Sequence, residues 1–129
     1  MTKSERQLME VLWNSEEGLT CAQINEYSKD KKWKDSYIHI MVKSLLKQGL
    51  IEVTGFELVS KSYARKFSPT MTRDESIVRA LVGEDVWSKD MIPPMIAAFV
   101  EKEADLATLE KINDIINAKK AQIMGNKAP

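Results

Sequence analysis

The chain has 129 residues, of which 43% are hydrophobic and 29% are charged, and its formal net charge is zero. This length suits one compact core or a small domain with an extension, and the absence of an apolar run of about 18 residues argues against a membrane-spanning helix. The charged N-terminus is followed by no apolar segment, so we expect no signal peptide. The single cysteine, Cys21, cannot form an internal disulfide, which suits the reducing cytoplasm.

The charges are unevenly distributed along the sequence. Residues 29–66 hold nine basic and four acidic side chains, a net charge of +5, so the rest of the chain carries −5. Such asymmetry is a reason to expect a local anionic partner. On charge alone, a solvated basic surface explains the pattern equally well.

Three helices are predicted within the first 50 residues. The first begins at a capping box in residues 2–5, and the second begins at a similar pattern in residues 20–23. The third runs from about 35 to 48, with Gly49 as the residue just beyond its C-terminus.

The third predicted helix has two unlike faces, because side chains three or four positions apart lie on the same side of a helix. Its apolar face comprises Ile38, Met41, Val42, Leu45 and Leu46. Its polar and basic face comprises Ser36, His39, Ile40, Lys43 and Lys47.

After Gly49 the pattern changes to that of extended chain. Residues 50–53 and 63–67 are predicted strands, and Pro69 ends the second. Residues 54–55 and 60–62 between them are rich in turn formers. Three short helices followed by a two-stranded hairpin form the winged helix-turn-helix arrangement, in which the third helix enters the DNA major groove.

A helical arm is predicted next. Residues 72–75 form a further capping box, Pro93-Pro94 suits the first turn of a helix, and a last helix is expected from Asp105 to about Ala121. So thin an arm cannot bury its apolar side chains against itself, which favours a symmetric homodimer. We assign dimerisation to Ile77, Leu81, Ile96, Phe99, Val100, Leu109, Ile112 and Ile116.

These elements predict a mainly α (α+β) protein with two domains. Residues 1–71 are expected to form a winged-helix DNA-binding domain, and residues 72–124 an α-helical dimerisation arm. Residues 125–129 are expected to be a disordered tail.

The order and spacing of these segments resemble the bacterial family of penicillinase, methicillin-resistance and copper-transport repressors. The resemblance covers nearly the whole chain and implies a winged-helix transcriptional repressor that binds operator DNA as a homodimer. It rests on residues 5–13 with their Leu12-Trp13 end, Leu19-Thr20 with Ile24, Trp33, Leu45 with Gly49, Ala64 to Pro69, residues 72–75, residues 99–103 and the final amphipathic helix.

The chain departs from the family pattern in its DNA-reading segments. Tyr37, Ile40 and Ser44 stand where the family usually has small threonines and an arginine, so the operator sequence cannot be carried over. The predicted wing between Gly49 and Pro69 is longer than usual and contains the apolar run Phe56-Glu57-Leu58-Val59.

The chain also departs from the family at its switches. The antibiotic-resistance repressors are cut between an asparagine and a phenylalanine in the arm, whereas here the pair is Ala98-Phe99, so release by a sensor protease stays open. The cysteine cluster of the copper-responsive members is missing, since Cys21 is the sole cysteine.

Catalysis and metal binding are poorly supported. His39 is the only histidine, and it lies on a basic helix face, where an exposed polar side chain is a simpler interpretation than a catalytic base. His39 and Cys21 together are too few ligands for a usual zinc site, and no Gly-rich phosphate loop is present. We therefore expect no enzymatic activity, no metal and no cofactor.

The expected DNA contacts divide by chemistry. The first turn of a recognition helix normally reaches base edges, and Ile40 suits a thymine methyl group. Basic side chains farther along the helix and on the wing suit phosphates. The residues assigned to DNA binding are Lys34, Ser36, Tyr37, His39, Ile40, Lys43, Lys47, Lys61, Arg65 and Lys66.

The expected mechanism is repression by occupancy of a palindromic operator, with half-site centres about 34 Å apart or a multiple of this. Two alternatives stay open. One is a protein-interaction module that uses residues 56–59 with Ile40, and the other is a small-molecule sensor with a pocket near Trp87.

Overall fold

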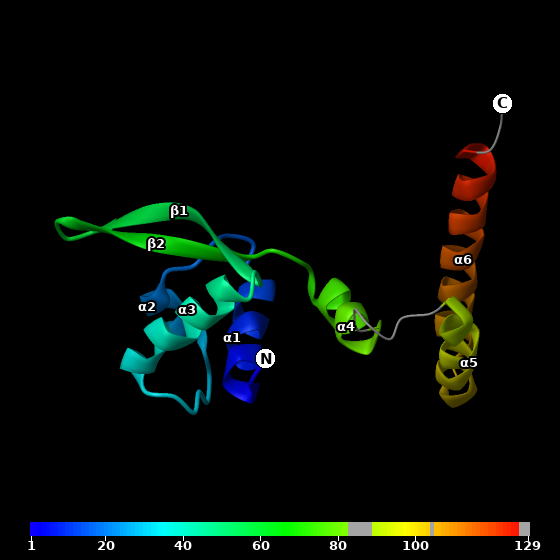
Figure 1. Cartoon of the computed structure of the whole chain (residues 1–129), viewed down its shortest axis with the longest axis horizontal. Helices are drawn as coiled ribbons and strands as arrows, with labels where there is room; N and C mark the ends of the chain where they lie inside the picture. Colours follow the sequence, from blue (N-terminus) through cyan, green and yellow to red (C-terminus); the bar gives the residue numbers. More distant parts are fainter. Residues whose placement is uncertain (83–88, 104, 127–129) are drawn as a thin grey trace. The chain divides into compact units, whose positions relative to one another are not determined.

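The computed structural model describes residues 1–82, 89–103 and 105–126. These residues form six α helices, two short 3-10 helices and one two-stranded antiparallel sheet (Figure 1). The winged-helix α+β fold expected from the sequence is thus confirmed. Internal contacts divide the chain into two units, residues 1–82 and 83–129. The first unit includes helix α4 (Arg73–Val82), which the sequence-based boundary after residue 71 placed with the arm.

The first two helices begin at the predicted capping boxes. Helix α1 (Lys3–Trp13) is capped by Thr2, and helix α2 (Cys21–Tyr27) is capped by Thr20. In both, the threonine hydroxyl accepts a hydrogen bond from the backbone three residues later, and that residue's side chain accepts one from the threonine amide. Two otherwise unsatisfied amides are paired at each helix start.

The third predicted helix is two elements. A 3-10 turn, η1 (Asp35–Tyr37), leads directly into helix α3 (Ile38–Lys47). Gly49 lies just beyond the helix, as predicted, and its φ of 74° is left-handed. There the amide of Leu50 donates to the carbonyl of Leu45 at 3.0 Å, which closes the last turn.

The hairpin is longer than predicted. Strand β1 (Ile51–Val59) pairs antiparallel with strand β2 (Ser62–Pro69), and the two-residue loop between them contains Ser60 with a φ of 57°. The predicted turn at residues 54–55 is wrong, because both residues lie within β1. Thr54 is instead the extra residue of a β-bulge between Val53 and Gly55.

This bulge shifts the alternation of side chains along β1. Val53 pairs with Phe67, but Phe56, three residues later, pairs with Arg65. Paired residues share a face of the ribbon and alternate residues share a face of a strand, so Phe56 joins the face that carries Phe67. Without the extra residue, Phe56 would lie on the opposite face.

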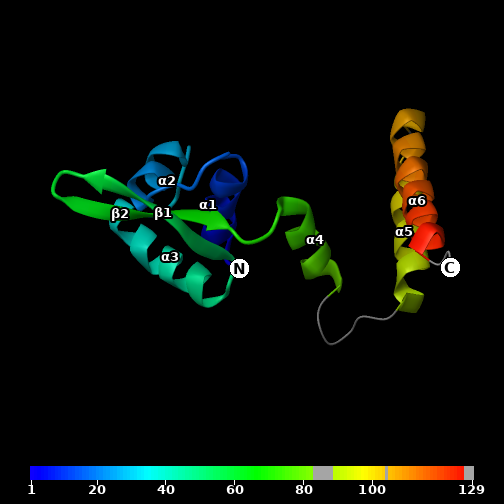
Figure 2. The same ribbon diagram turned by 90° about the horizontal axis from the view of Figure 1, so that it is seen from above.

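The core of the first unit lies between the three N-terminal helices and the base of the hairpin (Figure 2). An isolated bridge between Leu19 and Phe67 joins the helical part to β2 through two backbone hydrogen bonds of 2.8 and 2.9 Å. The buried hydrophobic residues are Leu8, Met9, Leu12, Leu19, Ile24, Trp33, Ile38, Met41, Val42, Leu45, Ile51 and Phe67.

The start of α4 is attached to α1. The indole nitrogen of Trp13 donates to the carbonyl of Met71 at 2.9 Å. The guanidinium of Arg73 contacts the carboxylate of Glu10 at 2.6 Å and the side-chain oxygen of Asn14 at 3.0 Å, and it lies 5.9 Å from the centroid of the Trp13 ring. These contacts explain why α4 groups with the first unit.

The described part of the second unit is helical. A short 3-10 turn, η2 (Lys89–Met91), precedes helix α5 (Ile92–Lys102), whose first turn contains the two expected prolines. Helix α6 (Leu106–Asn126) lies beside α5 in both views (Figures 1 and 2). It extends past Ala121, the expected end of the last helix, so that prediction was too short.

The expected tail began at residue 125. Gly125 and Asn126 belong to α6, and residues 127–129 lie outside the described residues. Trp87, near which a small-molecule pocket was one alternative, also lies outside them.

Candidate nucleic-acid interface

Helix α3 has the two faces that its sequence predicts. Four apolar side chains on one face are at most 2% exposed, and they hold the helix against the core: Ile38, Met41, Val42 and Leu45. On the outer face His39, Lys43 and Lys47 are exposed, as is Ile40, at 58%. Tyr37 at the end of η1 is 46% exposed. The helix therefore presents hydroxyl, imidazole, ammonium and aliphatic groups on one surface, with no acidic residue along its length.

A buried carboxylate holds the C-terminal half of α3 in position. Glu5 of α1 is 5% exposed. Its Oε2 accepts hydrogen bonds from the hydroxyl of Ser44 and the side-chain nitrogen of Gln48, each at 2.9 Å, and its Oε1 accepts one from the amide of Thr2 at 2.9 Å. Burial raises the pKa of Glu5, but these hydrogen bonds outweigh it and leave the pKa below its ordinary value. The carboxylate is therefore ionised at neutral pH and ties α3 to α1.

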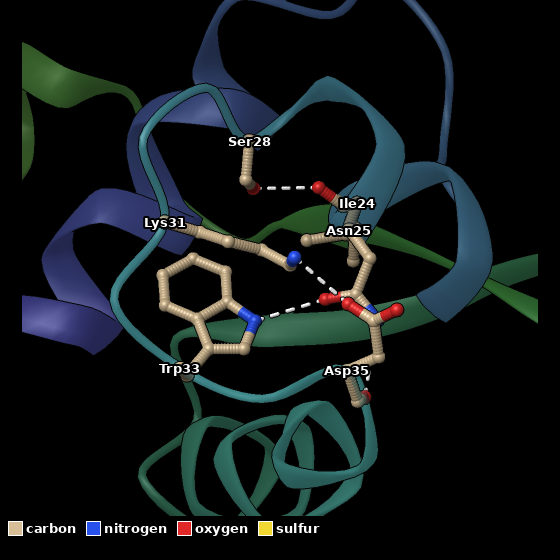
Figure 3. Close-up of polar contacts among 6 residues, drawn as sticks. All are labelled: Ile24, Asn25, Ser28, Lys31, Trp33 and Asp35. Carbon is tan, nitrogen blue, oxygen red and sulfur yellow. Dashed lines mark hydrogen bonds and ion pairs between the residues drawn. The ribbon is translucent and has the colours of Figure 1, made fainter.

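The start of the helix is held by a second group of contacts (Figure 3). The indole nitrogen of Trp33 donates to the side-chain oxygen of Asn25 at 2.9 Å, and the Asn25 side-chain nitrogen donates to the carbonyl of Asp35 at 3.1 Å. The ammonium of Lys31 lies 2.8 Å from the Asp35 carboxylate. Both ends of the exposed helix are thus attached to the helices behind it, which limits its freedom to reorient.

The cations of the hairpin occupy different places. Lys61 lies at the apex in the two-residue loop and is exposed. Arg65 is exposed and its guanidinium lies 5.1 Å from the centroid of the Phe67 ring, whereas Lys66 is half-buried. Lys34, which precedes η1, and Ser36 within it are exposed. Of the ten residues assigned to DNA contact, nine are exposed on the first unit, and Lys66 is the exception.

A groove of about 720 Å³ lies between α2, the start of α3 and the hairpin. His39 contributes to its helical side, and Val59 and Arg65 contribute to its hairpin side. Cys21 also lines it, and burial raises the pKa of its thiol although the nearby Arg65 works in the opposite direction. Cys21 is thus a neutral thiol at neutral pH.

The residues assigned to dimerisation are poorly covered within one chain. Leu109 and Ile112 of α6 are half-buried, and the other six are between 38% and 59% exposed. Those six are Ile77 and Leu81 of α4, Ile96, Phe99 and Val100 of α5, and Ile116 of α6. No residue of α5 or α6 is buried.

The model of the family described as penicillinase repressor matches residues 1–118. The chain belongs to the penicillinase repressor family. The match spans the winged helix, the attached α4 and most of the helical arm, and it confirms the resemblance read from the sequence. No curated protein matches the sequence.

Membership of the penicillinase repressor family makes the chain a DNA-binding transcriptional repressor, and this is a family of regulators rather than of enzymes. Within the described residues, no cluster of three or more His, Cys, Asp or Glu side chains is arranged to hold a metal ion. Helices long and apolar enough to cross a membrane are likewise absent from the described part of the chain.

Sequence reasoning missed the residues that hold helix α3 in position. Ser44 was grouped with the departures from the family's DNA-reading pattern, yet its hydroxyl is bonded to Glu5. Asn25 was not singled out at all, although a buried tryptophan needs an acceptor for its ring nitrogen and Asn25 supplies one to Trp33. The need of the Trp33 ring nitrogen for an acceptor was the signal from which a hydrogen-bond partner near Trp33 could have been predicted.

The Ala98-Phe99 pair, which stands where the antibiotic-resistance repressors are cut, lies within a helix. Ala98 and Phe99 both belong to α5, and the Phe99 side chain is 59% exposed.

Proposed function

We propose that this repressor acts in the cytoplasm as a homodimer that places the α3 helices of two chains in successive major-groove half-sites of a palindromic operator. Repression then follows from occupancy of the site. The observation that carries the proposal is the outer face of α3, which is exposed, basic and free of carboxylates while its opposite face is buried in the core.

The chemistry of that face suits duplex DNA. Ser36, Tyr37 and His39 precede or begin α3, where a recognition helix reaches base edges. Ile40 supplies an apolar contact for a thymine methyl group, and Lys43 supplies a charged donor for a base or a phosphate. Lys34, Lys47, Lys61, Arg65 and Lys66 supply phosphate contacts, which set the orientation and the salt dependence of binding.

The arm supports the homodimer. Soluble monomers rarely expose large contiguous apolar surfaces, and a two-fold interface covers the same patch on both chains. The half-buried Leu109 and Ile112 lie on α6 together with the exposed Ile116, four positions farther along the helix. A partner arm that covers this stripe and the exposed Phe99 of α5 would remove these side chains from water. Tethering two reading domains in this way makes the second half-site contact intramolecular.

Selection of duplexes from a random pool tests the proposal, with sedimentation of the free protein as a second measurement. We expect an enriched inverted repeat, a dimer in solution, and an affinity that falls as salt rises, with a logarithmic slope of about 0.9 per phosphate contact. An enriched single half-site would contradict the proposal. A free protein that sediments as a monomer and binds the operator as a monomer would also contradict it.

The inducing signal is a separate part of the proposal. We infer that derepression acts on the arm, either through an inducer or through a protease that cuts near Ala98-Phe99. Both residues of this pair lie in helix α5 of the arm. Incubation with the sensor protease of a penicillinase repressor system, followed by mass measurement, would give fragments split at this bond if the protease route applies, and intact chain if it does not.

A further inference from the structure

We propose that the end of the wing, residues 55–66 beyond the bulge, is a wedge that enters the minor groove beside each half-site and bends the operator. This inference rests on the proposed function, because it requires that α3 binds the adjacent major groove. It concerns the apolar side chains of this segment, Phe56, Leu58, Val59 and Tyr63, which the assigned DNA contacts leave out.

The wing end carries four large apolar or aromatic side chains that the fold leaves in water. Phe56 is 63% exposed, Leu58 59%, Val59 53% and Tyr63 70%. None of them belongs to the buried core. They contribute little to the stability of the monomer, and a cluster of this kind marks a surface for a partner.

The register concentrates these side chains near the apex. Leu58 pairs directly with Tyr63, and Phe56 pairs with Arg65 on the same face of the ribbon. Val59 pairs with Ser62 next to the two-residue loop and belongs to the other face of the ribbon. The bulge at Thr54 is what brings Phe56 and Leu58 onto the face of Tyr63, so one local feature of the backbone builds the apolar surface.

The charges around this surface indicate a polyanionic occupant. The wing end has three cations and one carboxylate. Lys61 lies at the apex and Arg65 beside Phe56, whereas the carboxylate of Glu57 belongs to the other face of the ribbon, opposite Ala64. A side chain set that is apolar at its centre and cationic at its margins fits the sugar walls and flanking phosphates of a nucleic-acid groove.

The wing end and the recognition helix border the same groove. His39 of α3 lines one side of it, and Val59 and Arg65 of the hairpin line the other. The hairpin extends beyond α2 and α3 in both views (Figures 1 and 2). In duplex DNA each strand's backbone separates the major groove from the minor groove. When α3 lies in the major groove and one backbone passes between α3 and the hairpin, the minor groove faces the wing.

The contact is expected to act through DNA shape. Phe, Leu and Val side chains have no hydrogen-bonding groups, so they cannot read base edges, and the minor groove carries a degenerate pattern in any case. Apolar side chains inserted into a minor groove partly unstack a base step and kink the duplex by about 20–90°. The operator should therefore favour flexible steps such as TA or CA/TG at positions that α3 does not touch.

The test measures the bend and the affinity on the selected operator, using circularly permuted fragments. The main variant combines F56S and L58S. A rescue variant, F56L with L58M, keeps apolar side chains at both positions, and Y27S removes an aromatic side chain of α2 that is 52% exposed and lies outside residues 55–66. Because the wing residues contact water in the free protein, the unfolding temperature of each variant should match that of the wild type.

We expect the wild type, the rescue variant and Y27S to bend the operator alike. The double serine variant should lose most of the bend and bind at least about tenfold more weakly, equivalent to about 1.4 kcal/mol. Wild-type complexes without a bend, or a double serine variant with unchanged bend and affinity, would overturn the wedge, and the latter is the outcome expected if the surface docks another protein. In both cases the operator would still be selected, so the proposed function would stand. Failure to select any duplex would instead refute the proposed function.

Discussion

The buried carboxylate of Glu5 offers the sharpest test of how this protein holds helix α3 in position. The substitution Glu5→Gln keeps the size and shape of the side chain but replaces one carboxylate oxygen with an amide nitrogen. The carboxylate accepts three hydrogen bonds, from Thr2, Ser44 and Gln48. An amide has only one oxygen, so at least one of these donors loses its acceptor, and the remaining bonds lose their ionic character.

The magnitude follows from these contacts. A hydrogen bond to a charged group contributes about 1.5–3 kcal/mol, and an unsatisfied buried donor costs a similar amount. We therefore expect Glu5→Gln to lower the free energy of unfolding by about 2–3 kcal/mol at neutral pH. For a unit of 82 residues, about 1 kcal/mol corresponds to about 4–8 °C in the unfolding temperature.

The pH dependence gives the result its diagnostic value. The pKa of Glu5 is lower in the folded protein than in the unfolded chain. Its contribution to stability is therefore fully present above the unfolded pKa and is lost as the pH falls through the folded pKa. As the pH falls below the ordinary glutamate pKa of about 4.3 and towards the lower folded pKa, Glu5 becomes protonated and resembles glutamine, so the difference between wild type and variant should shrink.

Urea unfolding at pH 7 and at acidic pH measures this difference directly. Glu16→Gln is the matched control, since Glu16 is exposed, and it should leave stability nearly unchanged. A Glu5→Gln variant as stable as wild type at pH 7, or a deficit that stays constant on acidification, would refute the assignment of Glu5 as an ionised clamp.

Three further predictions concern other parts of the molecule. Lys43→Glu, on the exposed face of α3, should abolish operator binding in a gel-shift assay without changing the unfolding temperature. The same charge reversal at the exposed Lys111 of α6 should leave binding intact, and equal losses from both variants would place the DNA contact elsewhere. Phe99→Asp should convert the dimer to a monomer in sedimentation experiments, because Phe99 is 59% exposed in one chain and a carboxylate at an apolar interface is strongly unfavourable. An unchanged dimer would exclude Phe99 from the dimer contact. Leu45→Ala, at a fully buried site, should lower the free energy of unfolding by about 2–5 kcal/mol, and a smaller loss in urea unfolding would mean that the core collapses around the cavity.

Local signals were sufficient to predict much of the fold. The capping boxes at Thr2 and Thr20 and the left-handed Gly49 depend on residues a few positions apart, and all three are present in the structure. The two faces of α3 follow from helical periodicity, so the exposure of Lys43 and the burial of Leu45 were both predictable. The family resemblance needed only the order of such segments along the chain.

Tertiary structure decided the features that join distant parts of the chain. The pairing of β1 with β2 turned Thr54-Gly55 from an expected turn into a bulge, because register is a property of two strands and is not visible in either one. Glu5 meets Ser44 across 39 positions of sequence, and only the packing of α1 against α3 makes that carboxylate a buried acceptor. Helix periodicity and capping are short-range effects that the amino-acid sequence by itself determines, whereas which polar groups lose water, and which partners replace it, is decided only when the helices and the hairpin pack together.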